Sequence, residues 1–101
     1  MKKIYFTITG MSHYYGDNFF EKGMTVTLVK EKDNEVDSEA IKVELEGLGT
    51  VGYVANSPYT VLGESYSAGR LYDKIGKTAT GTVLHKLPKG VLCILNRKGK
   101  K

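Results

Sequence analysis

The chain has 101 residues and a mass of 11.2 kDa, which is the size of one domain and leaves no room for a second. Hydrophobic residues make up 41% of it and charged residues 26%, values close to globular averages that argue against a disordered chain. The formal net charge is +4, with lysines and arginines gathered at residues 2–3 and 86–101. This asymmetry favours an acidic partner such as a nucleic acid, although a solvated tail that aids solubility has the same pattern.

Cys93 is the only cysteine, so the chain cannot form an intramolecular disulfide. Residues 1–3 lead into an alternating segment and not into the apolar run of a signal peptide. No stretch approaches the roughly 20 apolar residues that a transmembrane helix needs. We therefore expect a monomer in the reducing cytoplasm that makes no contact with a membrane.

Four segments in the first half alternate hydrophobic and polar residues with the period of a β-strand. They are residues 4–8, 24–29, 41–46 and 50–54. In the first segment, Ile4, Phe6 and Ile8 share one face. Gly47 and Gly49 lie between the last two segments, in a loop of hairpin length. The sequence therefore predicts four strands, the last two of them paired.

The segment after these strands has a different pattern. A short helix is predicted from a cap at Asn56 or Ser57 to a stop at Gly63. Residues 68–75 place apolar and polar side chains at helical spacing, which predicts a second helix of about two turns. The sequence thus predicts two short helices between the fourth strand and the end of the chain.

Residues 78–86 and 91–95 are two further strands joined by a turn. Six short strands in a chain of this size must hide their edges, and closing into a barrel with the helices at one opening does so. The predicted fold class is therefore mainly β, a small OB-like barrel of about six strands with two short helices.

Two motifs match known binding sites in letters but not in context. Gly47, Gly49 and Gly52 follow the dinucleotide fingerprint, yet the next residues continue an extended pattern where that fingerprint needs a helix. Acidic residues at the spacing of an EF-hand loop are Asp33, Glu35, Asp37, Glu39 and Glu44. Ser38 stands where that loop needs glycine, and both flanks alternate as strands, so a turn rich in hydrogen-bond acceptors is the preferred interpretation.

Candidate catalytic and metal-binding residues are few. His13, His85 and Cys93 are too scattered to copy a zinc spacing. The serines lack the strand-to-helix turn that exposes a nucleophile. We therefore expect no catalytic site, no metal and no cofactor.

Three segments stand out because each is a strand end that leads into a polar or aromatic loop. They are GMSHYYG at residues 10–16, LVKEKDNEVDSEAIKV at residues 28–43 and VGYV at residues 51–54. Together they resemble the HIRAN domain family. In that family a glycine and aromatic cluster is followed by an acidic or basic residue with x-x-Asn-x-x-Asp-x-x-Ala-(Ile/Val)-(Lys/Arg)-Val, and then by a (Val/Leu)-Gly-(Tyr/His) step. The resemblance covers residues 8–55.

The resemblance implies a small OB-like barrel, found at the front of eukaryotic fork-remodelling helicases and as stand-alone bacterial or phage proteins. In the helicases this domain captures the 3′-hydroxyl end of single-stranded DNA. For this chain it implies one HIRAN-like domain over residues 1–101, with a flexible basic tail at residues 96–101. It also implies that the chain binds single-stranded nucleic acid, DNA in preference to RNA, and has a protein partner in a repair or replication assembly.

The nucleic-acid-binding residues that the resemblance implies are His13, Tyr14, Tyr15, Asn34, Val36, Asp37, Tyr53 and Asn56. The aromatic stacking region includes His13 and Tyr14, the end-binding loop runs from Asn34 to Asp37, and Tyr53 and Asn56 fall beside that loop. Two of these positions depart from the helicase pattern. Val36 replaces an aromatic stacker and Asn56 replaces a basic phosphate contact. Either the specificity for an end is weaker in this chain, or the stacking ring comes from Tyr14, Tyr15, Tyr53 or a phenylalanine.

Aromatic side chains fit such a function, because unpaired bases stack on rings for about 1 to 3 kcal/mol each. The chain has seven tyrosines and three phenylalanines, although Tyr5, Phe6, Tyr53 and Tyr72 also fit core or rim packing. The alternative function is a protein-interaction or regulatory module that uses the same barrel surface, or Phe19 and Phe20, without binding nucleic acid.

Asp37 generates a prediction about the end of the strand. A carboxylate repels a phosphate but accepts a hydrogen bond from a terminal 3′-hydroxyl, worth about 1.5 to 3 kcal/mol. Asp37→Asn should therefore reduce the preference for a 3′-hydroxyl over a 3′-phosphate by about tenfold or more, measured by fluorescence anisotropy with paired oligonucleotides. Asn34→Ala is the control, because it should weaken both substrates together. An unchanged ratio in a folded protein would make Asp37 a turn cap.

Overall fold

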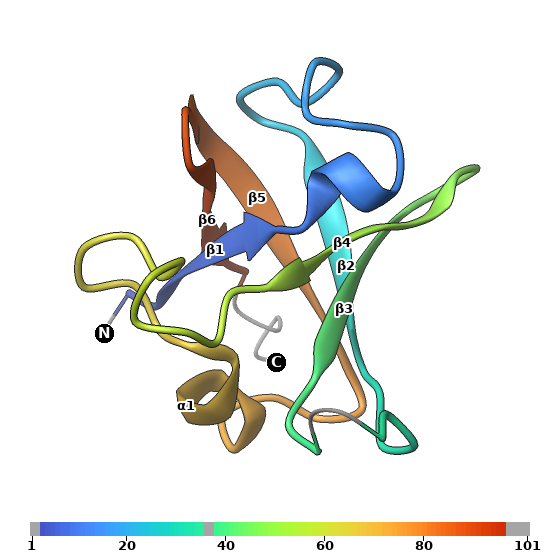
Figure 1. Cartoon of the computed structure of the whole chain (residues 1–101), viewed down its shortest axis with the longest axis vertical. Helices are drawn as coiled ribbons and strands as arrows, with labels where there is room; N and C mark the ends of the chain where they lie inside the picture. Colours follow the sequence, from blue (N-terminus) through green and yellow to red (C-terminus); the bar gives the residue numbers. More distant parts are fainter. Residues whose placement is uncertain (1–2, 36–37, 97–101) are drawn as a thin grey trace.

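The computed structural model describes residues 3–35 and 38–96. In this part of the chain it has six strands, one α-helix and one short 3-10 helix (Figure 1). The strands are β1 (Tyr5–Thr9), β2 (Thr25–Lys30), β3 (Ile41–Leu45), β4 (Gly49–Val54), β5 (Thr78–Leu87) and β6 (Gly90–Leu95). The helical elements are η1 (Met11–His13) and α1 (Ala68–Tyr72).

The strands form a closed barrel in the order β1-β4-β3-β2-β5-β6, and all neighbours are antiparallel. Closure gives the backbone of each strand a partner on both sides, which removes the exposed edges that six short strands would otherwise carry. Register shifts between Val43 and Glu44 and between Val83 and His85 mark irregularities of the bulge type. The predicted mainly β, OB-like barrel is confirmed.

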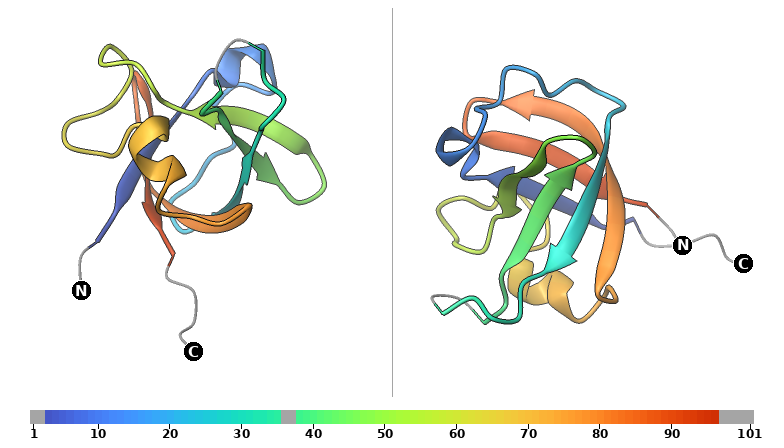
Figure 2. Two further views of the ribbon diagram at one scale, coloured as in Figure 1. Left: turned by 90° about the horizontal axis from the view of Figure 1, so that it is seen from below. Right: turned by 90° about the vertical axis from the view of Figure 1, so that its right-hand side faces the viewer.

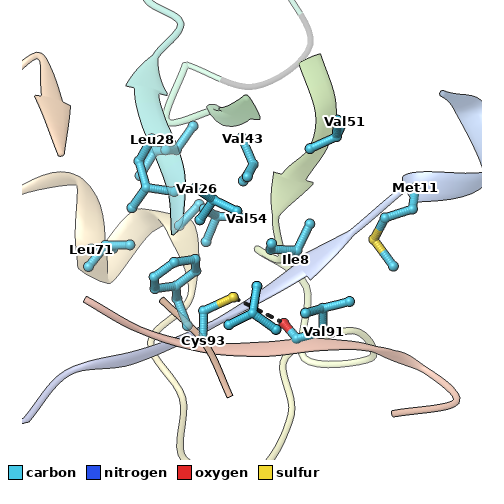
Figure 3. Close-up of a cluster of buried hydrophobic side chains, with 14 of the residues drawn as sticks. Ile8, Met11, Val26, Leu28, Val43, Val51, Val54, Leu71, Val91 and Cys93 are labelled. Atoms are coloured by element: carbon cyan, nitrogen blue, oxygen red, sulfur yellow. Dashed lines mark hydrogen bonds between the residues drawn. The ribbon is translucent and has the colours of Figure 1, made fainter. Parts of the chain in front are cut away.

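The core lies inside the barrel and is built by the alternation seen in the sequence. Phe6, Ile8, Leu28 and Val43 are each 0% exposed. In β2 and β3, the residues on either side of Leu28 and Val43 are half-buried. Figure 3 shows Ile8, Leu28 and Val43 pointing from different strands into one interior cluster, to which Phe6 also belongs. Burial raises the pKa of Cys93 to about 12, so this core thiol stays protonated at neutral pH.

One end of the barrel is covered by α1, which lies across the opening in the left view of Figure 2. The side chain of Ser67 caps this helix by accepting from the backbone N–H of Arg70, and Leu71 is 0% exposed in the core.

Only Asn96 of the predicted basic tail is described, and its backbone N–H donates to the Thr80 carbonyl at 2.9 Å. Within the described part of the chain, no helix has the length and apolar character to cross a bilayer.

The helix predicted from Asn56 or Ser57 to Gly63 is wrong. The Ser57 carbonyl accepts from the backbone N–H groups of both Thr60 and Val61, which closes one turn, but the chain does not continue as a helix. It instead returns to β1, where the Tyr66 N–H donates to the Tyr5 carbonyl at 2.7 Å. The second predicted helix, residues 68–75, is shorter than expected and ends at Tyr72.

Neither of the two motifs set aside in the sequence is joined to a helix. Gly49 and Gly52 belong to β4, so no helix follows them. The acidic segment is flanked by β2 and β3, not by helices.

Phe20 is 1% exposed and its ring stacks on Phe19 with centroids 4.5 Å apart. This pair therefore packs with the core and is not an exposed anchor for a partner.

Gly52 permits the close approach of β4 to β1 and generates a prediction. A Cβ atom on Gly52 would lie 2.8 Å from both the Ile8 Cγ2 atom and the Thr9 carbonyl oxygen. Gly52→Ala should therefore lower the free energy of unfolding by about 1 to 3 kcal/mol, measured by urea denaturation. Gly76→Ala is the control, because a Cβ there meets nothing within 4 Å. Equal losses in the two variants would contradict the close-packing argument.

Candidate functional site

The candidate site lies on the outer wall of the barrel, where β1, β4 and β3 run side by side. Tyr53 pairs with Thr9 on one side and with Lys42 on the other. Val54, next to Tyr53, and Ile41 and Val43, on either side of Lys42, are buried in the core. Successive side chains in a strand point to opposite faces, so Tyr53 and Lys42 face outward together.

Glu31 ties the loop after β2 to this wall. Its Oε1 atom accepts hydrogen bonds from the Tyr53 hydroxyl at 2.7 Å and from the Asn34 side-chain amide at 2.9 Å. The backbone supports the same arrangement, since the Glu31 N–H donates to the Ala40 carbonyl at 2.9 Å. One carboxylate oxygen therefore fixes two side chains that are 19 positions apart in the sequence.

The pKa values of Glu31 and Tyr53, which share a hydrogen bond, shift in opposite directions. Hydrogen bonds from Tyr53 and then Asn34, with a smaller contribution from the positive charge of Lys42, lower the pKa of Glu31. Burial, followed by the hydrogen bond to Glu31, raises the pKa of Tyr53 well above its usual range. At neutral pH the pair is thus a carboxylate acceptor and a phenol donor, which is a charge-assisted hydrogen bond.

Tyr14 supplies a second ring beside Tyr53. The two ring centroids lie 6.4 Å apart, with an angle of 39° between the planes, and Tyr14 is 42% exposed. The segment that carries Tyr14 is held by Met11, whose side chain is buried and whose carbonyl accepts from the Tyr14 and Gly16 N–H groups. Gly10 and Gly16 bracket the segment with φ values of 76°, a conformation that favours glycine.

Tyr53 also lines an open hollow of about 590 Å³. Its lining includes Asn34, Ala40, Tyr53, Asn56 and Thr60, so it joins the loop after β2 to the segment after β4. The Asn56 Oδ1 atom accepts from the Gly69 N–H at 2.8 Å, which fixes this side chain against the start of α1. The hollow therefore has a pre-arranged polar rim and an aromatic wall.

The structure brings together half of the predicted site residues. Tyr53, Asn34 and Asn56 line the hollow, and Tyr14 lies beside Tyr53. His13 and Tyr15 are exposed on and after η1, and the Tyr15 hydroxyl donates to the Leu48 carbonyl at 3.3 Å, at the β3–β4 turn. Val36 and Asp37 lie outside the described residues.

Two residues of this site were not predicted. Glu31 stands three positions before Asn34, at the acidic or basic position that opens the sequence pattern of residues 31–43. Lys42 stands at the Lys/Arg position of the same pattern, and its Nζ lies 3.3 Å from Glu44 Oε2. The pattern contained both signals, but only the fold places them beside Tyr53.

Metal chemistry has no support in the described ranges 3–35 and 38–96. No group of three or more histidine, cysteine, aspartate or glutamate side chains there is placed to hold a metal ion. The site contains hydrogen-bond donors, hydrogen-bond acceptors and aromatic rings, which are groups that bind a ligand by polar contacts and stacking.

A closed antiparallel barrel with an aromatic and polar outer wall defines a small binding module. The chain belongs to the HIRAN domain family, whose family model matches residues 1–84 of the 101. No curated protein and no solved structure matches the chain. The family consists of nucleic-acid-binding modules that are not enzymes on their own.

The hydrogen bond between Tyr53 and Glu31 generates a prediction for pH dependence. Because the folded state lowers the pKa of Glu31 from 4.5, this interaction stabilises the fold fully above that pH and is lost as the pH falls through the lowered value. In Tyr53→Phe the pKa of Glu31 should rise toward 4.5, measured by NMR titration of its carboxyl carbon.

The control is Tyr59→Phe, which removes the hydroxyl of a tyrosine that is 90% exposed. It should leave the pKa of Glu31 unchanged. A Glu31 titration that is the same in Tyr53→Phe as in the unmodified protein would contradict the bond.

Proposed function

We propose that this chain binds single-stranded DNA, in preference to RNA, and holds its 3′-hydroxyl end at the wall and hollow around Tyr53. It does so as a monomer and without catalysis of its own. The family supports nucleic-acid binding, and the preference for an end follows from the HIRAN pattern around Asn34 and Asp37. Asp37 lies outside the described residues, so its role rests on that pattern.

The observation that carries the proposal is the pair of hydrogen bonds on the Glu31 Oε1 atom. Binding a flexible single strand costs less when the receiving side chains are already ordered. Glu31 orders Asn34 and Tyr53 before any ligand arrives, and Tyr14 adds an exposed aromatic face beside them. Rings for stacking and polar groups for a sugar or base edge are therefore presented together.

The charges at the site fit the end of a strand better than its middle. Glu31 is ionised at neutral pH, and a carboxylate repels the phosphates of a continuous strand. Lys42 lies next to it on the same wall and offers one cation for a single phosphate. A terminal nucleoside with a phosphate on one side only matches this arrangement.

Fluorescence anisotropy with short labelled strands tests the function. The protein should bind DNA with a 3′-hydroxyl more tightly than the same DNA with a 3′-phosphate, and more tightly than the matching RNA. Affinity should fall with salt, with a slope of about −0.7 per phosphate neutralised. An affinity that is independent of salt and of end chemistry would favour a protein-interaction module.

Tyr14 generates the prediction that tests stacking. Tyr14→Ala should weaken binding of single-stranded DNA by about 1 to 3 kcal/mol, because it removes one exposed stacking ring. It should leave the fold intact, since the ring is 42% exposed. Tyr14→Phe keeps the ring and should bind as the unmodified protein does. Unchanged affinity in Tyr14→Ala would show that this ring only packs against Tyr53.

A further inference from the structure

A second hollow, which we call the groove, adjoins the first. It has a volume of about 1080 Å³ and lies between the segment after β4 and the barrel wall at Tyr5 and Leu92. Asn56 and Ser57 line both the hollow and the groove, so the two adjoin at these residues. A ligand that occupies the hollow reaches the groove by crossing the segment that separates them.

The turn of residues 57–61 forms a ridge between them. Thr60 lines the hollow, whereas Pro58 and Val61 line the groove. Tyr59 lies between these residues in the sequence, lines neither the hollow nor the groove and is 90% exposed, so its ring projects into solvent from the turn. No part of the predicted site included this tyrosine.

The ridge is an ordered structure. The Ser57 Oγ atom accepts from the Tyr59 N–H at 3.0 Å, and the Ser57 carbonyl accepts from the Thr60 and Val61 N–H groups at 2.9 Å. The next residues are anchored to β1, where the Leu62 N–H donates to Thr7 Oγ1 at 3.2 Å. The Tyr59 ring is thus presented from a backbone that the barrel holds in place.

The groove carries the charges expected for a phosphate backbone. Arg70 and Lys3 line it, together with one carboxylate, Glu64. The Arg70 guanidinium carbon lies 4.0 Å from the centroid of the Tyr66 ring, a cation–π contact that holds the guanidinium over this ring while Arg70 stays exposed. A planar guanidinium held in this way suits bidentate contact with a phosphate.

The geometry points to a path for the strand beyond its bound end. The nucleotides on the 5′ side cross the ridge with one base stacked on Tyr59 and then lie in the groove, where Arg70 and Lys3 contact their phosphates. This path rests on the proposed function and extends it from an end site to a site for several nucleotides. Single-strand sites on OB-type folds take about 4 to 16 nucleotides, so a path of this kind is in the usual range.

The test compares two oligothymidylates with a free 3′-hydroxyl, one of about three and one of about eight nucleotides, a pair that falls below and within the usual site size. In fluorescence anisotropy the unmodified protein should bind the longer strand at least about fivefold more tightly, the gain expected from one stacked base. Tyr59→Ala should lose about fivefold of this gain, the part that the stacked base supplies, and keep its affinity for the shorter strand. Tyr59→Phe retains the ring and should keep the gain.

The phosphate contacts are tested by a matched pair of charge variants. Arg70→Gln should weaken binding of the longer strand and reduce its salt dependence by about one phosphate, and leave the shorter strand unaffected. Lys22→Gln removes one charge from an exposed lysine that lines neither the hollow nor the groove, and should change neither affinity.

The outcomes separate the path from the function on which it rests. Equal affinity for both lengths, or a length gain that is undiminished in Tyr59→Ala, would overturn the path while leaving the end site in place. Failure of the unmodified protein to bind either strand would overturn both.

Discussion

The pairing of β1 with β4 on one side and with β6 on the other closes the barrel, and the rest of the structure depends on it. Gly52 makes the first of these pairings possible, because a side chain there would collide with β1. Closure places β4 between β1 and β3, so that Tyr53 faces outward between Thr9 and Lys42. The same pairing brings η1, which follows β1, to the edge of the site, where Tyr14 meets Tyr53.

The Glu31 carboxylate joins the loop after β2 to the outer wall at β4, so that the two form one site. The bond from the Tyr53 hydroxyl to Glu31 joins the loop after β2 to β4, and the bond from Asn34 to the same oxygen orders the loop itself. Asn56, which follows β4, makes a similar connection, because its side chain accepts a hydrogen bond from Gly69 in α1. Both connections use polar side chains to order polar groups, which keeps hydrogen-bonding surface available in a fixed arrangement.

The strands were predictable because a closed barrel with a packed interior imposes period two, and residues such as Phe6, Ile8 and Leu28 follow it. The helix predicted after Asn56 is absent. Ser57 followed by Pro58 signals the start of a helix equally well when the chain completes only a single turn. Tyr53 and Asn34 were found through the family pattern. The role of Glu31 depends on a partner 22 residues away, which only the register of β3 with β4 brings near.

The most direct measurement is an NMR titration of the isotopically labelled chain with a short DNA strand that ends in a 3′-hydroxyl. The account predicts that the amide signals of Tyr14, Glu31, Asn34 and Tyr53 shift together and saturate with one dissociation constant, because these residues form one binding surface. Shifts confined to the opposite wall of the barrel, at β5 and β6, would contradict it, and so would an absence of shifts throughout.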